Sequence, residues 1–160
     1  MNPDIADLAR EAREFSQNNL DSLARPAISG ASLPDSAFER LYAFGFRLLA
    51  SSQHEQALSV FAFLFAQRPT EPRVLSGFGH SLLGLGDIGQ AALMHSLAHA
   101  AEPDNPAHVL AIAEDLIAME APMADEMLRA AEVLAQGQPS HAGVARRAQA
   151  LRGLLQQGRP

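Results

Sequence analysis

The residues of this chain with the clearest capacity for chemistry are its six histidines. His95 and His99 lie four positions apart, the spacing at which two imidazoles on one helix can share a zinc ion. No Glu follows His95 to complete a His-Glu-x-x-His motif, and no third ligand has a clear spacing. His95 also falls at a packing position of the repeat described below. We therefore expect no metal site and no cofactor.

Other catalytic arrangements are missing from the sequence. The glycines at 77–79 and 84–89 formally resemble nucleotide-binding loops, but no predicted strand precedes them. The adjacent Glu114 and Asp115 face different ways on a helix, so they do not form a catalytic carboxylate pair. Without Cys there is no thiolate nucleophile and no disulfide. The sequence predicts a protein that is not an enzyme.

The elements that must position these residues are helices. The 160 residues suffice for one domain, and 30 Ala and 22 Leu stand against only 11 Val, Ile and Thr together. The formal net charge of -6 argues against direct binding of nucleic acid. The sequence has no long apolar window that would indicate a membrane span. It also has no basic leader that would indicate a signal peptide. We expect an all-α protein located in the cytoplasm, without nucleic-acid or membrane contact.

A repeat of 34 residues organises the middle of the chain. Its first two copies pair Leu41, Phe44, Gly45, Leu48, Ala57 and Pro69 with Leu75, Phe78, Gly79, Leu82, Ala91 and Pro103. A third copy follows with one residue deleted at its turn, and the predicted units are 38–71, 72–105 and 106–138. Each unit contains two apolar runs of helical spacing separated by a break, which predicts a helix, a tight turn and a second helix. The small residue in the first helix of each unit lets the second helix approach closely.

Capping signals and flanking segments agree with these boundaries. Ser36 to Glu39 and Ser52 to Glu55 have the spacing of capping boxes, Asp87 to Gln90 is a looser one, and Asn105 precedes a proline. Residues 1–37 are predicted to form an N-terminal amphipathic helix and a linker. Residues 139–160 are predicted to form a capping helix and tail that cover the last repeat. This helix presents Arg146, Arg147 and Arg152 outward and its apolar side chains inward.

The small and large positions over 34 residues, closed by a proline, resemble the tetratricopeptide repeat. This resemblance implies three repeats stacked into a right-handed superhelix, with the first helices lining a concave face. Three repeats between an N-terminal helix and a C-terminal cap further resemble the class II chaperones of bacterial type III secretion translocators. Local similarity is greatest over Leu33 to Gln67, where Glu39-x-Leu41-Tyr42-x-x-x-Phe46 matches the first helix of that family, and Gly77-Phe78-Gly79 matches a Gly-apolar-Gly step.

The resemblance also indicates a groove on the concave face. Four positions of each first helix face it in the resembled repeat: Glu39, Tyr42, Phe46 and Leu49, then Arg73, Ser76, His80 and Leu83, then Ala107, Leu110, Glu114 and Ile117. All of these except Glu39 and Ala107 are expected to contact the client. Tyr42, Phe46 and Leu49 follow one another by about one helical turn and form an apolar strip. In the resembled family the groove takes an extended translocator segment with a Pro-x-Leu-x-x-Pro pattern, so these three are placed at its first pocket. The alternative is that the chain's own N-terminal segment covers the strip.

A second surface is implied for self-association. The resembled chaperones dimerise through the N-terminal helix and the first repeat, which makes Ile5, Leu8, Phe15 and Phe63 candidates for a homodimer interface. Phe61, Phe63 and Phe65 cannot all point the same way on a helix, so at least one of the last two is expected to be exposed. For Phe65, burial against the first helix of the next repeat is about as well supported as exposure.

Three functions are compatible with these features. The leading hypothesis is a chaperone that binds hydrophobic translocators in the bacterial cytoplasm through the groove and keeps them competent for export. The second is a tetratricopeptide adaptor or scaffold outside secretion, with a polar or carboxylate ligand held by charges such as Arg73, whose binding falls with salt. The third is a co-regulator of a transcription activator. The sequence leaves the choice among them open.

Overall fold

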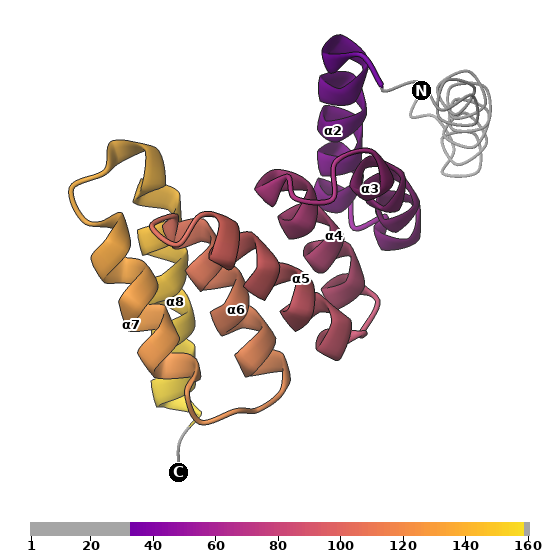
Figure 1. The fold of residues 1–160 in the computed structure, drawn as a ribbon. Coiled ribbons are helices and arrows are strands. Elements are labelled where there is room, and N and C mark those ends of the chain that lie inside the picture. The colour runs from indigo at the N-terminus through magenta and orange to yellow at the C-terminus, as the bar shows by residue number, and fades with distance from the viewer. Residues whose placement is uncertain (1–32, 159–160) are drawn as a thin grey trace, which may run out of the picture. The chain divides into compact units, whose positions relative to one another are not determined.

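The computed structural model describes residues 33–158, and within them every regular element is helical (Figure 1). The elements are α2 (Asp35–Ala50), α3 (His54–Gln67), α4 (Pro72–Gly84), α5 (Ile88–Ala101), α6 (Pro106–Ala118), α7 (Ala124–Ala135), a 3-10 turn (Pro139–His141) and α8 (Ala142–Gln157). The predicted N-terminal helix and its residues Ile5, Leu8 and Phe15 lie outside the described part. The predicted all-α fold is confirmed for the rest.

The chain divides into two compact units, with the boundary between Leu41 and Tyr42 inside α2. Of the first unit, residues 33–41 are described, and Leu33, Phe38 and Leu41 among them are buried. Within the second unit each helix from α3 onward packs against the next one along the chain (Figure 1). The helices α4 and α5, and then α6 and α7, fall within the second and third predicted repeats. Helix α2 begins three residues before the predicted start of the first repeat.

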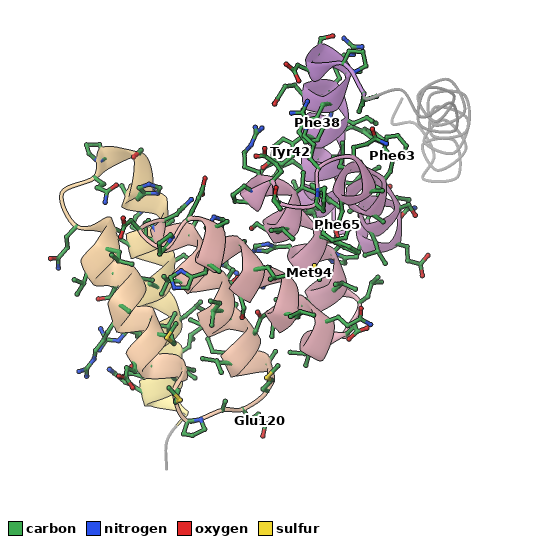
Figure 2. All side chains as sticks on the ribbon, viewed as in Figure 1. Phe38, Tyr42, Phe63, Phe65, Met94 and Glu120 are labelled. Atoms are coloured by element: carbon green, nitrogen blue, oxygen red, sulfur yellow. The ribbon has the colours of Figure 1, made fainter. Side chains whose placement is uncertain are left out.

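The turn inside each helix pair shows the 34-residue period directly in the backbone. Ser52, Gly86 and Glu120 stand 34 positions apart, and each has a positive φ, of 57°, 82° and 54°. The amide after each of them donates to a carbonyl five residues earlier: Gln53 to Leu48 (2.9 Å), Asp87 to Leu82 (3.0 Å) and Ala121 to Leu116 (2.8 Å). This left-handed residue ends the first helix of each pair. Figure 2 shows the third of them, Glu120, in the loop between α6 and α7.

Two of the four predicted caps form. No capping box begins at Ser36, because α2 already begins at Asp35. The Asp87 carboxylate accepts from the Gln90 amide at 3.3 Å, and the Asn105 side chain accepts from the Ala107 amide at 3.0 Å. The expected capping box at Ser52 is not formed, and Gln53 is the N-cap of α3 without a side-chain bond. The reason is that the left-handed residue of the turn is Ser52, one position before the cap.

Close helix contacts depend on a small residue opposite a large one. A Cβ added at Gly45 would lie 3.0 Å from the Phe61 ring, and one added at Gly79 would lie 2.4 Å from the His95 ring. Phe61 and His95 are both fully buried. In the third pair Ala113 and the fully buried Leu128 belong to one core cluster. The small positions identified in the sequence therefore lie where the helices approach most closely.

Phe63 and Phe65, which follow Phe61 on α3, are labelled in Figure 2. Both are half-buried. The Phe65 ring lies 5.6 Å from the Phe78 ring in a tilted arrangement, so Phe65 packs on α4. We expected at least one of the two to be exposed; the structure gives both an intermediate exposure, because Phe65 packs on α4 and Phe63 keeps only part of its surface accessible. Phe63 stays a candidate for a dimer contact.

Helix α8 covers the last pair, as predicted for a capping helix. Its buried Ala148 joins Val109, Leu110, Leu128 and Ala131 in one cluster. Arg152 does not point outward as expected. Its guanidinium bonds to Asp125 and Glu132 of α7, each at 3.1 Å, and so ties α8 to α7. Among residues 33–158 no helix has the length and hydrophobicity that a membrane crossing requires.

Candidate functional site

A large hollow among the described residues lies along the first helices of the three pairs. It consists of two adjoining parts, of about 630 and 350 Å³, that share most of their lining. The shared residues are Tyr42 and Phe46 of α2, Arg73, Ser76 and His80 of α4, Glu114 of α6 and Arg147 of α8. We call this hollow the groove. Its size is that of a site for a small ligand or a few residues of a peptide.

The 34-residue period explains why these residues meet. Tyr42, Ser76 and Leu110 occupy one position of the repeat, and Phe46, His80 and Glu114 occupy the next position, one turn further along. Equivalent positions on stacked helices line the same face, so each position becomes a row across the groove.

One wall of the groove is apolar and partly open. Phe46 exposes 59% of its surface, although it is a large aromatic side chain. Tyr42, Leu49 and Leu83 are half-buried beside it. The Tyr42 ring meets the Phe61 ring edge-on at 6.0 Å, which fixes its orientation. The exposed Phe46 and its half-buried apolar neighbours together form a surface that suits an apolar side chain of a partner.

The other wall carries alternating charges. The Arg73 guanidinium lies 4.8 Å from the centre of the Tyr42 ring, and its Nε bonds to Glu71 at 3.0 Å. Arg147 of α8 pairs with Glu114 of α6. The two arginines in the groove therefore already have carboxylate partners.

Between the two walls lies His80, which joins a buried polar chain. His80 Nδ1 is 2.8 Å from the Ser76 carbonyl oxygen and 3.2 Å from His95 Nε2. On the other side of the His95 ring, Nδ1 lies 2.7 Å from Asp115 Oδ2, and both of these side chains are almost fully buried. Burial above all, and then the neighbouring His95, lower the pKa of His80.

The structure brings together most of the groove residues expected from the sequence. Tyr42, Phe46, Leu49, Arg73, Ser76, His80, Leu83, Leu110 and Glu114 all line the hollow. Ile117 does not. It packs against the core cluster beneath α8 and lines a separate hollow with Leu155, because the C-terminal helix covers the end of α6.

Arg147 and His54 are among the residues of the groove that sequence reasoning missed. Arg147 was placed on the outer face of the capping helix, but it reaches Glu114. His54, the first residue of α3, also lines the groove, and a Cβ added at Gly84 would lie 2.2 Å from its Nδ1. The glycine at 84 is the only sequence signal for His54, since it leaves the space that the ring occupies. Nothing local to residues 139–160 signals the position of Arg147.

The fold is similar to that of solved type III secretion translocator chaperones. No family model matches the sequence, and no curated protein matches it. Among solved structures, PcrH from Pseudomonas aeruginosa has 26% identity and a TM-score of 0.70, covering 78% of this chain and 95% of PcrH. PcrH in complex with the chaperone binding region of PopB has 27% identity and a TM-score of 0.67, covering 74% and 97%.

The Yersinia enterocolitica type III secretion translocator chaperone SycD shares the fold at 21% identity, with a TM-score of 0.70 and coverage of 82% and 96%. The resemblance to translocator chaperones that the sequence indicated is thus confirmed. Almost the whole length of each of these solved chains matches this chain. These neighbours are described as chaperones and not as enzymes.

Proposed function

We propose that this protein is a cytoplasmic chaperone that holds an extended segment of a type III secretion translocator in the groove before export. The observation that carries the proposal is the open apolar wall around Phe46, at the position where the family resemblance places the first client pocket. PcrH has been solved with the chaperone binding regions of both PopB and PopD, which supports a translocator as the client.

The chemistry of the groove suits an extended peptide. Alternate side chains of such a segment enter apolar pockets, while its backbone meets polar groups. Tyr42, Phe46 and Leu49 provide the apolar contacts, and Ser76 and His80 provide polar atoms opposite them. Binding of this kind masks an aggregation-prone segment without catalysis and without ATP.

The test is peptide binding by the full chain. The probe is a fluorescent synthetic peptide spanning the chaperone binding region of PopB, titrated with the protein and followed by anisotropy. We expect Phe46→Ala to weaken binding by about 10- to 100-fold, because burying one such side chain is worth about 1.5–3 kcal/mol. Far-UV circular dichroism should be unchanged, since Phe46 is mostly exposed.

The matched control is Leu93→Ala. Leu93 exposes 54% of its surface on α5 and does not line the groove, so its removal should leave binding unchanged. Equal affinity for Phe46→Ala and the unmodified protein would overturn the placement of the client. Mass spectrometry of proteins that co-purify from the native host then identifies the natural client.

An adaptor for acidic ligands is less well supported. Such a ligand needs a cation to bind, and both arginines of the groove are paired with carboxylates of this chain. The two functions separate by salt, because a charge-clamped ligand is released at high ionic strength whereas an apolar contact persists.

A homodimer accompanies the proposed function. Structures of SycD include an alternative dimer, so that chaperone pairs with itself in more than one arrangement. For this chain the half-buried Phe63 is the described candidate for such a contact, and the other three candidates lie in residues 1–32.

A further inference from the structure

Behind the groove, three side chains from three helices form a continuous polar chain. Asp115 on α6 is 1% exposed and meets His95 on α5, which has no exposed surface. His95 in turn meets His80 on α4, whose side chain is 39% exposed and lines the groove. The chain therefore runs from a buried carboxylate to a partly exposed side chain that lines the groove.

The distances assign the protons. Nδ1 of His80 lies 2.8 Å from the Ser76 carbonyl oxygen, which only accepts, so this nitrogen carries a proton and donates. Nδ1 of His95 likewise donates to the Asp115 carboxylate at 2.7 Å. His95 Nε2 then has no proton and accepts from His80 Nδ1, which shares its proton between two acceptors. The ring atom of His80 that is left is Nε2, and it has a free lone pair.

We propose that Asp115, acting through His95, holds His80 in the form whose bare Nε2 accepts a hydrogen bond from a backbone N–H of the client. This inference rests on the proposed function and deepens it. An extended segment brings N–H groups that have no partner within the segment, and burying such a group without an acceptor is costly. The nearby Glu114 carboxylate is engaged by Arg147 and lies 3.9 Å from Nε2, beyond hydrogen-bond distance.

Burial and the neighbouring His95 keep the ring of His80 neutral. Burial is the main cause that lowers the pKa of His80, and His95 acts in the same direction, whereas the Ser76 carbonyl and the two acidic side chains of α6 oppose them. The charged and titratable groups around this ring are Arg73 on its own helix, His54, His95, Glu114, Asp115 and Arg147. Because the pKa of His80 lies below its ordinary value of 6.5, the neutral ring predominates at neutral pH, and the hydrogen bonds of Nδ1 then leave Nε2 as its acceptor.

The first test needs no client. Nitrogen-15 spectra of the imidazoles in the free, full-length protein at pH 7.5 distinguish a protonated from a bare ring nitrogen. We expect both His80 and His95 to carry the proton on Nδ1. In Asp115→Asn the charge that selects this form of His95 is lost, and the His80 signal should shift toward a mixture of the two neutral forms. A proton on Nε2 of His80 in the unmodified protein, or identical spectra in Asp115→Asn, would overturn the inference.

The second test uses the PopB peptide introduced above. His80→Phe keeps a ring of similar size but has no acceptor, and we expect it to weaken binding about tenfold, the usual worth of one hydrogen bond. A series of peptides with one N-methylated backbone amide each should contain one member that binds the unmodified protein about tenfold less tightly. That methylation should have no further effect on His80→Phe.

The two proposals fail in different ways. Binding of the peptide by His80→Phe at the affinity of the unmodified protein refutes the acceptor role, while the loss on Phe46→Ala still supports the client groove. Absence of any binding to the unmodified protein counts against the proposed function, and the spectra of the free protein then decide the proton positions.

Discussion

At the scale of single residues, the packing of the Phe61 ring depends on neighbouring glycines that have no side chain. The ring is fully buried and lies against glycines of two different helices, Gly45 on α2 and Gly77 on α4. A Cβ added at Gly77 would lie 2.2 Å from a ring carbon, which is closer than atoms can approach. The ring also supports Tyr42 at the groove, so packing in the core and the shape of the site are connected.

We therefore expect Gly77→Ala to lower the free energy of unfolding by about 1–3 kcal/mol, the usual cost of overpacking a core. The measurement is urea denaturation followed by circular dichroism. Gly89→Ala is the matched control, because nothing lies within 4 Å of its added Cβ. In an exposed helix that control should gain about 0.5–1 kcal/mol. A neutral result for Gly77→Ala would mean that the Phe61 ring can move aside at no cost.

At the scale of elements, the three helix pairs share one turn but not one residue type. The left-handed position is filled by Ser52, Gly86 and Glu120, and only the second is a glycine. A side chain at a left-handed position costs about 1–2 kcal/mol relative to the ordinary helical region, and glycine avoids that cost. The first and third turns are therefore held by the packing of their helices.

Glu120→Gly tests this idea at an exposed position. We expect the free energy of unfolding to rise by up to about 1 kcal/mol, because the gain in the turn exceeds the extra freedom of glycine in the unfolded chain. The measurement is the midpoint of thermal unfolding. Gly86→Ala should change the midpoint in the opposite direction. A lower midpoint for Glu120→Gly would show that the side chain at 120 stabilises the turn through a contact of its own.

At the scale of the whole molecule, α8 completes both a core and a site. It supplies the buried Ala148 to the cluster of α6 and α7, ties α7 through Arg152, and sends Arg147 into the groove. A helix pair that ends a repeat array exposes the face that a further repeat would cover. Helix α8 covers that face here.

Deletion of residues 139–160 should therefore destabilise more than the helix that it removes. We expect the loss of helical circular dichroism to exceed the share of the 16 residues of α8, because Leu128 and Ala131 lose their cover. Leu154→Ala is the control, since Leu154 is 64% exposed on α8 and its removal should leave the unfolding transition unchanged. A loss of signal that matches α8 alone would show that α6 and α7 do not need it.

Much of the site follows from the repeat. A period of 34 residues places equivalent positions on one face, so Tyr42 and Ser76, or Phe46 and His80, are assigned to the groove by counting along the chain. The period fails for Ile117, which has the correct position but lies beneath α8. It fails because the last repeat has a different neighbour from the first two.

The sequence by itself determined the helices, the spacing of their turns and the apolar rows of the groove, because each of these depends on residues that are close along the chain or repeated at a constant interval. Only the tertiary structure decided that Arg147 enters the groove and that Asp115, His95 and His80 form one polar chain. These contacts join different helices through side-chain atoms less than 4 Å apart. Such contacts depend on the angle and offset at which the helices pack, which no local pattern in the sequence records.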